Sequence, residues 1–226
     1  MASPTIVLAT LLDKGAPVTT EDTKVVAFVS AFASQAMALK DKPYSNWKEL
    51  AAYAKENPGA VTAGGSLVNM LAIASIADQA GIELTYVPYD GTGKAMNDFL
   101  GGHVDLGVTP AGIAVDYTDR VNVLIDAGDF EQSPETLASL GNPDTASSLG
   151  YEGFSAPRWI GVHKDTPDEI VNKISENMGK LLEDKAIAKL LAKIGEDVAF
   201  VPAADAQKKF NAMVAKAKKL APLLDK

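Results

Sequence analysis

The pattern of apolar and polar positions predicts short buried strands that alternate with amphipathic helices. The predicted strands are runs of largely apolar residues at 25–32, 60–63, 83–89, 104–109, 121–126, 159–163 and 197–201. Between most of these runs, apolar residues recur every three or four positions, which is the spacing of one helix face. This alternation predicts an α/β protein with mostly parallel sheets.

Two helix starts carry capping signals. Asn46 and Glu49 have the spacing of a capping box, and the sequence Asn57-Pro58-Gly59 ends the helix that follows. In the segment 166–169 (TPDE), Thr166 is the expected cap, followed by a proline at the first helical position and a glutamate three residues after the cap. The apolar face of that helix comprises Ile170, Val171, Ile174, Met178 and Leu181.

Other helices are predicted from apolar spacing and from the glycines that end them. They cover 70–80, 94–100, a segment with Ile187, Leu190, Leu191 and Ile194 that ends at Gly195, and a last one with Phe210, Val214, Ala217 and Leu220. Residues 127–155 are rich in Gly, Ser, Pro and Asp, which predicts a loop with a single helical turn.

Composition narrows the classes of function. The chain has 226 residues, of which 47% are hydrophobic, enough for one sizeable core or two small lobes. The net charge is −8, and no basic stripe with interleaved aromatic residues exists, so a nucleic-acid partner is not expected. The lysines near the C-terminus are interpreted as a solvated helix face. No apolar run reaches the ~18 residues that span a membrane, and no signal peptide is visible.

Residue types also argue against metal and thiol chemistry. The chain has no cysteine, which excludes thiol catalysis and disulfides, and its two histidines, His103 and His163, are far apart in sequence. We therefore expect neither a metal site nor a cofactor. There is no G-x-S-x-G motif and no evident pair of catalytic carboxylates, so we do not expect an enzyme.

The stretch VTAGGSLVNMLA (61–72) runs from a predicted strand into a predicted helix. Ala63, Gly64, Gly65 and Ser66 combine bare backbone with a hydroxyl at the helix N-terminus, where unpaired N–H groups favour an anion. Glycine between a strand and a helix is equally a simple turn residue. The pattern therefore leaves both an anion cradle and a plain turn open.

Two further segments have comparable alternatives. Thr109, Pro110, Ala111 and Gly112 follow a strand and precede a predicted helix, so they are a second cradle or another plain turn. Arg158 is either a bidentate partner of a ligand carboxylate or half of a surface ion pair. The segment 90–94 (DGTGK) lacks the spacing of a phosphate-binding loop and is rejected as one.

The middle of the chain resembles a known family. YVPYDGTGKAMNDFLGGHVDLGV (86–108) strongly resembles the signature of the tripartite tricarboxylate transporter substrate-binding proteins, the TctC or Bug family. That signature reads approximately V-P-Y-x-G-x-x-x-A-x-x-D-L-L-G-G-x-V-D, and Phe99 replaces its first leucine. WKELAAYAKENPGAVTAGG (47–65) and WIGVHKDTPDEIVNKI (159–174) are similar to flanking family segments.

The resemblance implies a periplasmic, non-catalytic solute receptor with a two-lobed, periplasmic-binding-protein-like fold. It implies a small organic carboxylate held by backbone N–H groups and hydroxyls of strand–helix loops, and membrane permease subunits as partners. Residues 63–66 resemble the second lobe's carboxylate cradle, and residues 109–112 its neighbour. Asn69 stands where many members carry histidine, and Arg158 where a small polar residue is common. Both residues are expected to tune the choice of ligand.

The start of the chain departs from the family pattern. Members open with a strand, a glycine-rich P-G-G-G-T-D loop, a helix and a second strand, and PTIVLAT (4–10) resembles only the tail of that region. We therefore expect an incomplete first lobe made of 1–44 and the return segment 156–226, a second lobe at 45–155, and hinges near 34–44 and 155–160. Without the glycine-rich loop, which is the first lobe's carboxylate cradle in the family, we expect ligand binding to be weakened or lost. The family implies a monomer, whereas an exposed strand edge favours self-association.

Three functions remain open from the sequence. The first is a carboxylate receptor for a tripartite tricarboxylate-type transporter. The second is a truncated or engineered α/β scaffold without ligand function, and the third is an α/β enzyme acting on a carboxylate or phosphate ester. Ligand binding separates the first two, and turnover identifies the third.

Overall fold

The computed structural model describes residues 19–130, 132–192 and 196–225. The chain divides into two compact units. The first unit comprises residues 1–31 and 156–219, and the second comprises residues 32–155 and 220–226. The long strand β1 (Thr23–Leu39) begins in the first unit and ends in the second. The predicted α/β class and two-lobed fold are confirmed.

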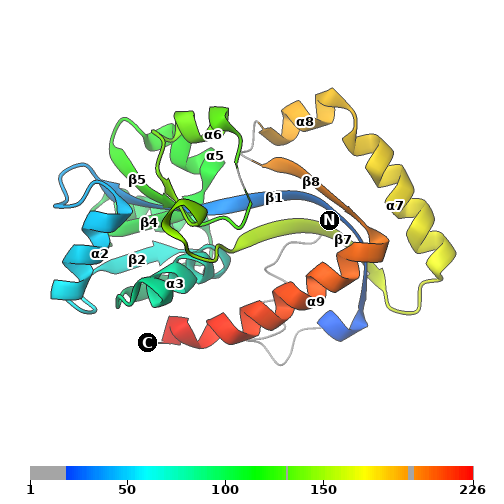
Figure 1. The fold of residues 1–226 in the computed structure, drawn as a ribbon, viewed down its shortest axis with the longest axis horizontal. Coiled ribbons are helices and arrows are strands. Elements are labelled where there is room, and N and C mark those ends of the chain that lie inside the picture. The colour runs from blue at the N-terminus through cyan, green and yellow to red at the C-terminus, as the bar shows by residue number, and fades with distance from the viewer. Residues whose placement is uncertain (1–18, 131, 193–195, 226) are drawn as a thin grey trace. The chain divides into compact units, whose positions relative to one another are not determined.

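The second unit is built on a sheet with the strand order β3-β2-β4-β1-β5-β6 (Figure 1). Its other strands are β2 (Thr62–Gly65), β3 (Thr85–Pro88), β4 (Leu106–Pro110), β5 (Val121–Asp126) and β6 (Asp144–Thr145). β2 is parallel to β3 and β4, whereas β1 is antiparallel to β4 and β5. Because β4 and β5 both run against β1, the carboxyl ends of β2, β3, β4 and β5 all meet at one edge of this sheet.

Helices cover both faces of this sheet. They are α2 (Trp47–Glu56), α3 (Leu67–Ala80), α4 (Thr92–Leu100), α5 (Ala111–Ala114) and α6 (Pro134–Ser139), with 3-10 turns at Val115–Tyr117 and Ser147–Leu149. The last turn, η4 (Ala221–Asp225), contacts α3. The predicted cap at α2 is confirmed, since the Glu49 amide donates to Asn46 Oδ1 at 3.0 Å. The returning bond differs from the predicted capping box, because the Glu49 carboxylate accepts from the amide of Ser45, one residue before the cap, at 2.7 Å.

The segment that resembles the family signature forms the frame of the second unit. Asp105 lies just before β4, and its carboxylate accepts from the Thr62 amide and hydroxyl of β2 at 3.0 and 2.8 Å. The same carboxylate pairs with the Lys42 ammonium at 2.5 Å, so it also ties down the loop that follows β1. On α4, the buried ring of Phe99 fills the space that a side chain at Gly107 of β4 would occupy.

The first unit packs helices against the first half of β1, together with β7 (Ser155–His163) and β8 (Asp197–Pro202). Its helices are α7 (Asp168–Leu182), α8 (Lys185–Ala192) and α9 (Ala203–Leu220). The predicted apolar face of α9 is confirmed: Phe210, Val214, Ala217 and Leu220 are buried. The Phe210 ring meets the Trp159 ring of β7 edge-on at 4.8 Å. The predicted end of α8 at residues 194 and 195 lies outside the described residues.

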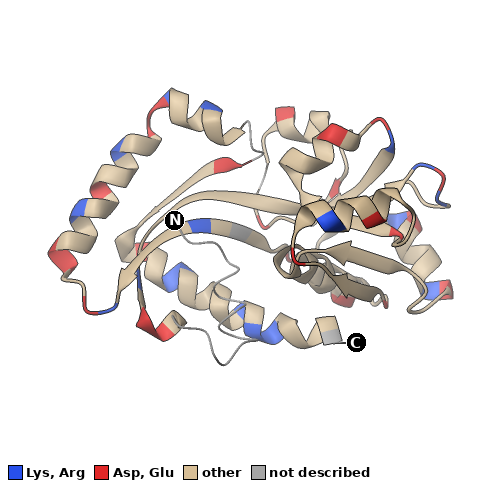
Figure 2. Ribbon diagram, turned by 180° about the vertical axis from the view of Figure 1, so that it is seen from behind, with Lys and Arg blue, Asp and Glu red and all other residues tan. Residues whose placement is uncertain are grey.

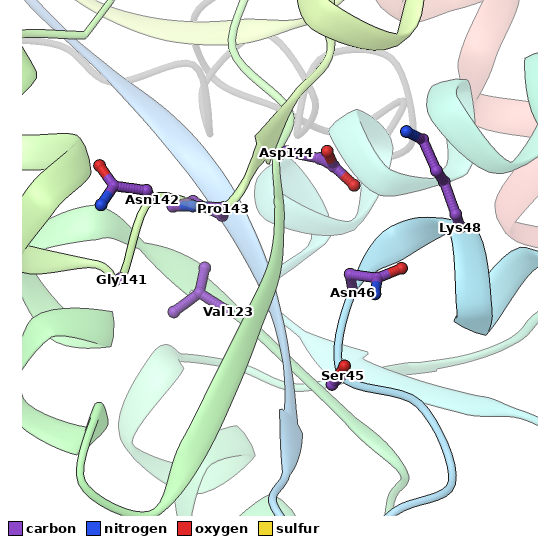
Figure 3. Close-up of a pocket in the computed structure, with 8 residues that line it drawn as sticks. All are labelled: Ser45, Asn46, Lys48, Val123, Gly141, Asn142, Pro143 and Asp144. Carbon is purple, nitrogen blue, oxygen red and sulfur yellow. The ribbon is translucent and has the colours of Figure 1, made fainter.

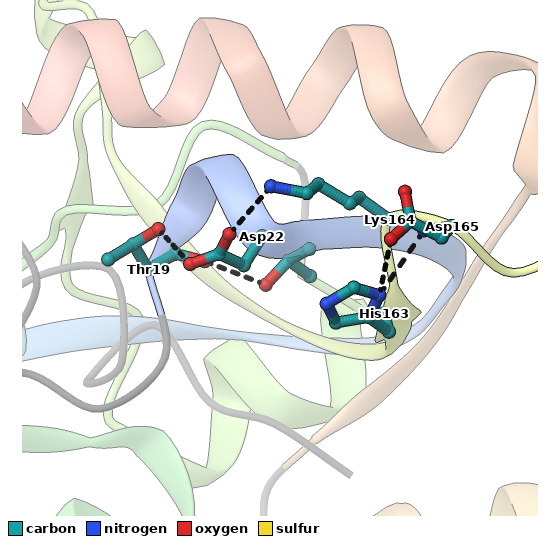
Figure 4. A network of polar contacts seen from close by, with 6 residues as sticks. Thr19, Asp22, His163, Lys164 and Asp165 are labelled. Carbon is teal, nitrogen blue, oxygen red and sulfur yellow. Dashed lines mark hydrogen bonds and ion pairs between the residues drawn. The ribbon is translucent and has the colours of Figure 1, made fainter.

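Exposed polar contacts tie the start of β1 to the end of β7 (Figure 4). The Asp22 carboxylate accepts from the Thr19 hydroxyl at 2.7 Å and from the Lys164 ammonium at 3.0 Å. These bonds lower the pKa of Asp22 below its usual value, with the Thr19 hydroxyl as the main cause. These contacts hold the start of β1 beside the end of β7. Because both the acid and the base reach solvent, the contacts add little to the free energy of unfolding.

The predicted start of α7 at a capping Thr166 is wrong. The N-cap position is Pro167, and no side chain caps α7. The helix begins one residue later than predicted, and the amides of Ile170 and Val171 bond to the Pro167 carbonyl. Next to this start, the Lys24 ammonium of β1 donates to the Thr166 carbonyl at 2.9 Å and pairs with Asp168 at 2.8 Å.

The predicted apolar face of α7 is only partly buried. Val171 is buried, whereas Ile170 and Leu181 expose 50% and 48% of their surface. Charged residues of both signs alternate along this helix, and most lysines of α9 are exposed, as predicted for a solvated face (Figure 2). No helix within the described ranges is long and apolar enough to cross a membrane.

We predict that Asp105→Asn destabilises the protein by about 1–3 kcal/mol at pH 7, because it weakens the bonds to Thr62 and Lys42. Burial by itself raises the pKa of Asp105, but the bonds from Lys42 and Thr62 outweigh it and leave the pKa lowered. A lowered carboxyl pKa gives stability that is fully present above the unfolded value of about 3.9 and is lost as the pH falls through the folded value.

The difference between wild type and Asp105→Asn should therefore shrink from pH 5 to pH 3. Urea unfolding at pH 7, 5 and 3 measures it. Asp41→Asn, which alters an exposed carboxylate beside Lys42, is the matched control and should change nothing. A difference that persists unchanged at pH 3 would contradict the role assigned to the Asp105 charge.

We predict that Gly107→Ala destabilises the second unit by about 1–3 kcal/mol, the usual cost of overpacking a core. A Cβ at Gly107 would lie 2.6 Å from Cδ1 of Phe99. The control is Gly93→Ala in α4, where a Cβ meets nothing within 4 Å and where alanine should stabilise the helix by about 0.5–1 kcal/mol. Thermal unfolding of both variants separates steric conflict from a general effect of removing glycine.

Candidate functional site

The candidate site is the edge of the second unit where β2, β3, β4 and β5 end. Gly65 of β2 stands in register with Val108 of β4, so Ser66 and Thr109 follow on neighbouring strands. β1 enters at the same edge, with Ser34 opposite Pro110, and with Gln35 opposite both Thr109 and Asp126. In open α/β sheets, ligands bind outside the carboxyl ends of strands. Nine of the ten predicted site residues belong to this unit, most of them at this edge; Arg158 belongs to the other.

Packing alone accounts for the two glycines of β2. A Cβ at Gly64 would lie 2.9 Å from the Tyr89 ring and 3.0 Å from Val104. A Cβ at Gly65 would lie 2.8 Å from the Val108 carbonyl oxygen. Ala63 and both glycines are buried within the sheet, where β3 and β4 flank them. The two glycines therefore allow close packing of their neighbours around the end of β2. The next residue along the chain, Ser66, is half-buried.

Ser66 and the start of α3 offer hydrogen-bond donors at this edge. Ser66 is half-buried and stands at the N-cap of α3, yet its hydroxyl makes no capping hydrogen bond. The first amides of α3 have no carbonyl within the helix to bond to, and the helix dipole gives this end a partial positive charge. Because α3 has 14 residues, this end has the full character of a helix N-terminus. The arrangement suits a carboxylate or another anion.

Asn69 lies in the first turn of α3 and is buried. Its Oδ1 accepts from the Ser34 hydroxyl of β1 at 3.3 Å. The side chain thus connects the start of α3 to β1 across the end of β4, and it stabilises the edge from within. Its predicted effect on ligand choice stays a prediction.

The second predicted cradle, at residues 109–112, has less to offer a ligand. Thr109 is buried, and its hydroxyl donates to the Pro110 carbonyl at 2.8 Å. Ala111 is buried and begins α5, which has only four residues, so this helix contributes little dipole. Pro110 and Gly112 are half-buried and stay accessible at the edge.

Arg158 of β7 forms an ion pair within the first unit. Its Nη2 and Nε lie 2.6 and 2.7 Å from Oε1 of Glu196. Glu196 is buried, and its Oε2 accepts from the Ser30 hydroxyl of β1 at 2.6 Å. The ion pair left open by the sequence is thus present, but its acid is buried rather than exposed. A contact between Arg158 and a ligand stays a prediction.

Two polar residues of the edge, Gln35 and Asp126, were not predicted from the sequence. The buried Asp126 carboxylate, at the end of β5, accepts from the Gln35 amide nitrogen at 2.8 Å and from the Gly128 amide at 2.8 Å. The amide nitrogen of Gln132 also donates to it. The only signal for them was a polar residue at the end of an apolar run, as in VNVLID, which is also how strands commonly end.

A separate polar hollow lies near the start of α2 (Figure 3). It has a volume of about 290 Å³ and contains none of the predicted site residues. The residues that line it are Ser45, Asn46, Lys48, Val123, Gly141, Asn142, Pro143 and Asp144. Asn46 already uses its Oδ1 to cap α2. Within the described ranges, no group of three or more histidine, aspartate or glutamate residues could hold a metal ion.

Comparisons with known proteins found relatives along most of the chain. A protein from Agrobacterium vitis, described as a UPF0065 protein in the TAR-I ttuE-ttuC' intergenic region, is 29% identical over 208 residues. That match covers 86% of this chain and 58% of the relative, so the chain spans little more than half the relative's length.

Solved structures show the same fold. Rpa4515 of R. palustris with adipate superposes with a TM-score of 0.80 at 20% identity, covering 99% of this chain and 76% of that one. MatC from Rhodopseudomonas palustris with bound malate gives a TM-score of 0.71 at 19% identity, covering 96% and 74%. The profile of the Tripartite tricarboxylate transporter family receptor, TctC, matches residues 12–225. The chain therefore belongs to the TctC family of tripartite tricarboxylate transporter receptors.

Proposed function

We propose that this protein is a periplasmic solute receptor that captures a small organic carboxylate and passes it to the membrane permease of a tripartite tricarboxylate-type transporter. The observation that carries this proposal is the N-terminus of α3 at the carboxyl edge, where the Ser66 hydroxyl makes no capping hydrogen bond and the first amides have no partner within the helix. Family membership supports it, as do the solved relatives with adipate and malate.

The proposed binding uses donors that are already in place. The first amides of α3 and the Ser66 hydroxyl would bond to the carboxylate oxygens, and the helix dipole would favour their negative charge. Residues 110–112 would form the neighbouring wall. Closure of the two lobes over the ligand would complete the site, with Arg158 as a further carboxylate partner. No covalent step is needed, so the proposed role involves no catalysis.

The strand β8 of the first unit, within the described residues, pairs only with β1, and Val198 and Phe200 on it each expose 37% of their surface. Such an edge favours pairing with another strand. We propose that the chain self-associates through β8. Sedimentation analysis that finds a monomer at all concentrations would contradict this proposal.

We predict that one class within a panel of mono-, di- and tricarboxylic acids raises the unfolding temperature of the chain. A ligand present at about 100 times its dissociation constant adds roughly 2.7 kcal/mol to the free energy of unfolding. Differential scanning fluorimetry with sodium chloride at equal ionic strength as the control measures this shift. A cooperative transition that no acid moves would favour the scaffold without ligand function.

We predict that Ser66→Ala weakens binding of the acid found in that panel by about 10- to 150-fold, the value of one hydrogen bond to a charged group. Because the Ser66 hydroxyl makes no capping bond, the stability of the empty protein should stay unchanged.

Ser133→Ala is the opposite case. The Ser133 hydroxyl caps α6 by accepting from the Thr136 amide at 3.1 Å, so its loss should cost about 1 kcal/mol of stability. The affinity should remain that of the wild type. Calorimetric titration and urea unfolding of both variants measure the two effects, and equal affinity of Ser66→Ala and wild type would remove Ser66 from the site.

A further inference from the structure

Gln35 holds a buried hydrogen-bond acceptor at the candidate site that nothing in the described chain satisfies. The residue lies on β1 opposite Thr109 and Asp126, and its side chain is fully buried. Its amide nitrogen donates to Oδ2 of Asp126 at 2.8 Å. No donor among the described residues reaches its Oε1.

Asp126 fixes which atom of the Gln35 amide is free. The Asp126 carboxylate also accepts from the Gly128 amide and from the Gln132 side chain, so it acts as an acceptor toward every one of these partners. With the Asp126 carboxylate as the acceptor, the Gln35 amide presents its nitrogen to Asp126. If the amide were turned over, two acceptors would face each other. The unsatisfied atom is thus an oxygen, and it requires a donor.

The position of this oxygen connects it to the proposed carboxylate site. Gln35 follows Ser34, whose hydroxyl bonds to Asn69 in the first turn of α3. Successive strand residues project to opposite faces of a sheet, so a ligand that lies across this edge meets groups from both faces. One side of the edge offers the donors of α3 and Ser66, and the other offers the acceptor of Gln35.

We propose that Gln35 Oε1 accepts a hydrogen bond from a hydroxyl or ammonium group of the ligand, and that the chain therefore selects hydroxy- or amino-substituted carboxylic acids over their unsubstituted analogues. This inference rests on the proposed carboxylate-binding function. A buried acceptor without a partner is costly, and a ligand that supplies the donor recovers this cost. An unsubstituted acid buries the oxygen again without a partner. Asp126 is a positioning residue that holds the Gln35 amide.

The test compares acids that differ in one group. Succinate, malate and aspartate share a four-carbon skeleton with hydrogen, hydroxyl or ammonium, and glutarate, 2-hydroxyglutarate and glutamate repeat the series with one more carbon. Titration calorimetry on the full chain should show at least about tenfold tighter binding of one substituted acid than of its parent, which equals 1.4 kcal/mol. The member that binds tighter shows whether a hydroxyl or an ammonium group is read.

Two variants separate the acceptor from general damage to the edge. Gln35→Leu removes Oε1 and should bring the ratio of the two dissociation constants close to one. Gln132→Leu, the matched control, also removes a donor from Asp126 but leaves Gln35 in place, so its ratio should remain that of the wild type. If Gln35→Leu does not fold, the ratio measured on the wild type still decides.

The outcomes distinguish this inference from the function on which it rests. If parent and substituted acids bind equally, the inference is overturned. Carboxylate capture, the proposed function, then still stands. If Gln35→Leu and Gln132→Leu lose the ratio together, the selectivity comes from Asp126 rather than from Gln35, which also overturns it. If neither these acids nor any acid of the wider panel of mono-, di- and tricarboxylic acids binds, the proposed function fails and takes the inference with it.

Discussion

The structure depends on burying one long strand that is not entirely apolar. β1 has 17 residues and is buried over nearly its whole length, yet its interior contains Ser30, Ser34 and Gln35. A buried polar group must find a partner, and each of these bonds to a different element. Ser30 bonds to Glu196, Ser34 to Asn69, and Gln35 to Asp126. These bonds fix β8, α3 and β5 to the same strand, and the candidate site forms where two of them meet.

The segment that resembles the family signature serves the fold rather than the ligand. Asp105 bonds β2 and the loop after β1, Phe99 fills the space left by Gly107, and the Tyr89 hydroxyl donates to Asp98 at 2.8 Å. All three contacts lie within the frame of the second unit. Resemblance in this segment therefore identifies the architecture. The residues proposed to bind the ligand lie elsewhere, chiefly at the strand ends.

Regular elements could be predicted from the sequence wherever one local pattern decides them. The strand at 121–126 was predicted with its observed bounds, because an unbroken apolar run needs no other explanation. The first strand was predicted to end at 32 but reaches Leu39, because Ser34 and Gln35 interrupt the apolar run. Their polarity is satisfied by Asn69 and Asp126, which are 35 and 91 residues away in sequence. The start of α7 was predicted one residue early, because Thr166-Pro167-Asp168-Glu169 has the local pattern of a capping box but no side chain caps the helix.

Only the part of the candidate site that depends on a local sequence pattern could be predicted. Residues 63–66 were found because glycine and serine between a strand and a helix form a local pattern, whereas the acceptor side arises only when β1 pairs with β4 and β5. This division matters for specificity. A pocket that separates ligands by one methylene gains only about 10- to 200-fold, whereas buried groups that require a hydrogen bond reject ligands lacking it by up to about 10⁵-fold. The unsatisfied oxygen on β1, as proposed, would therefore discriminate more strongly than a difference of one methylene in ligand length.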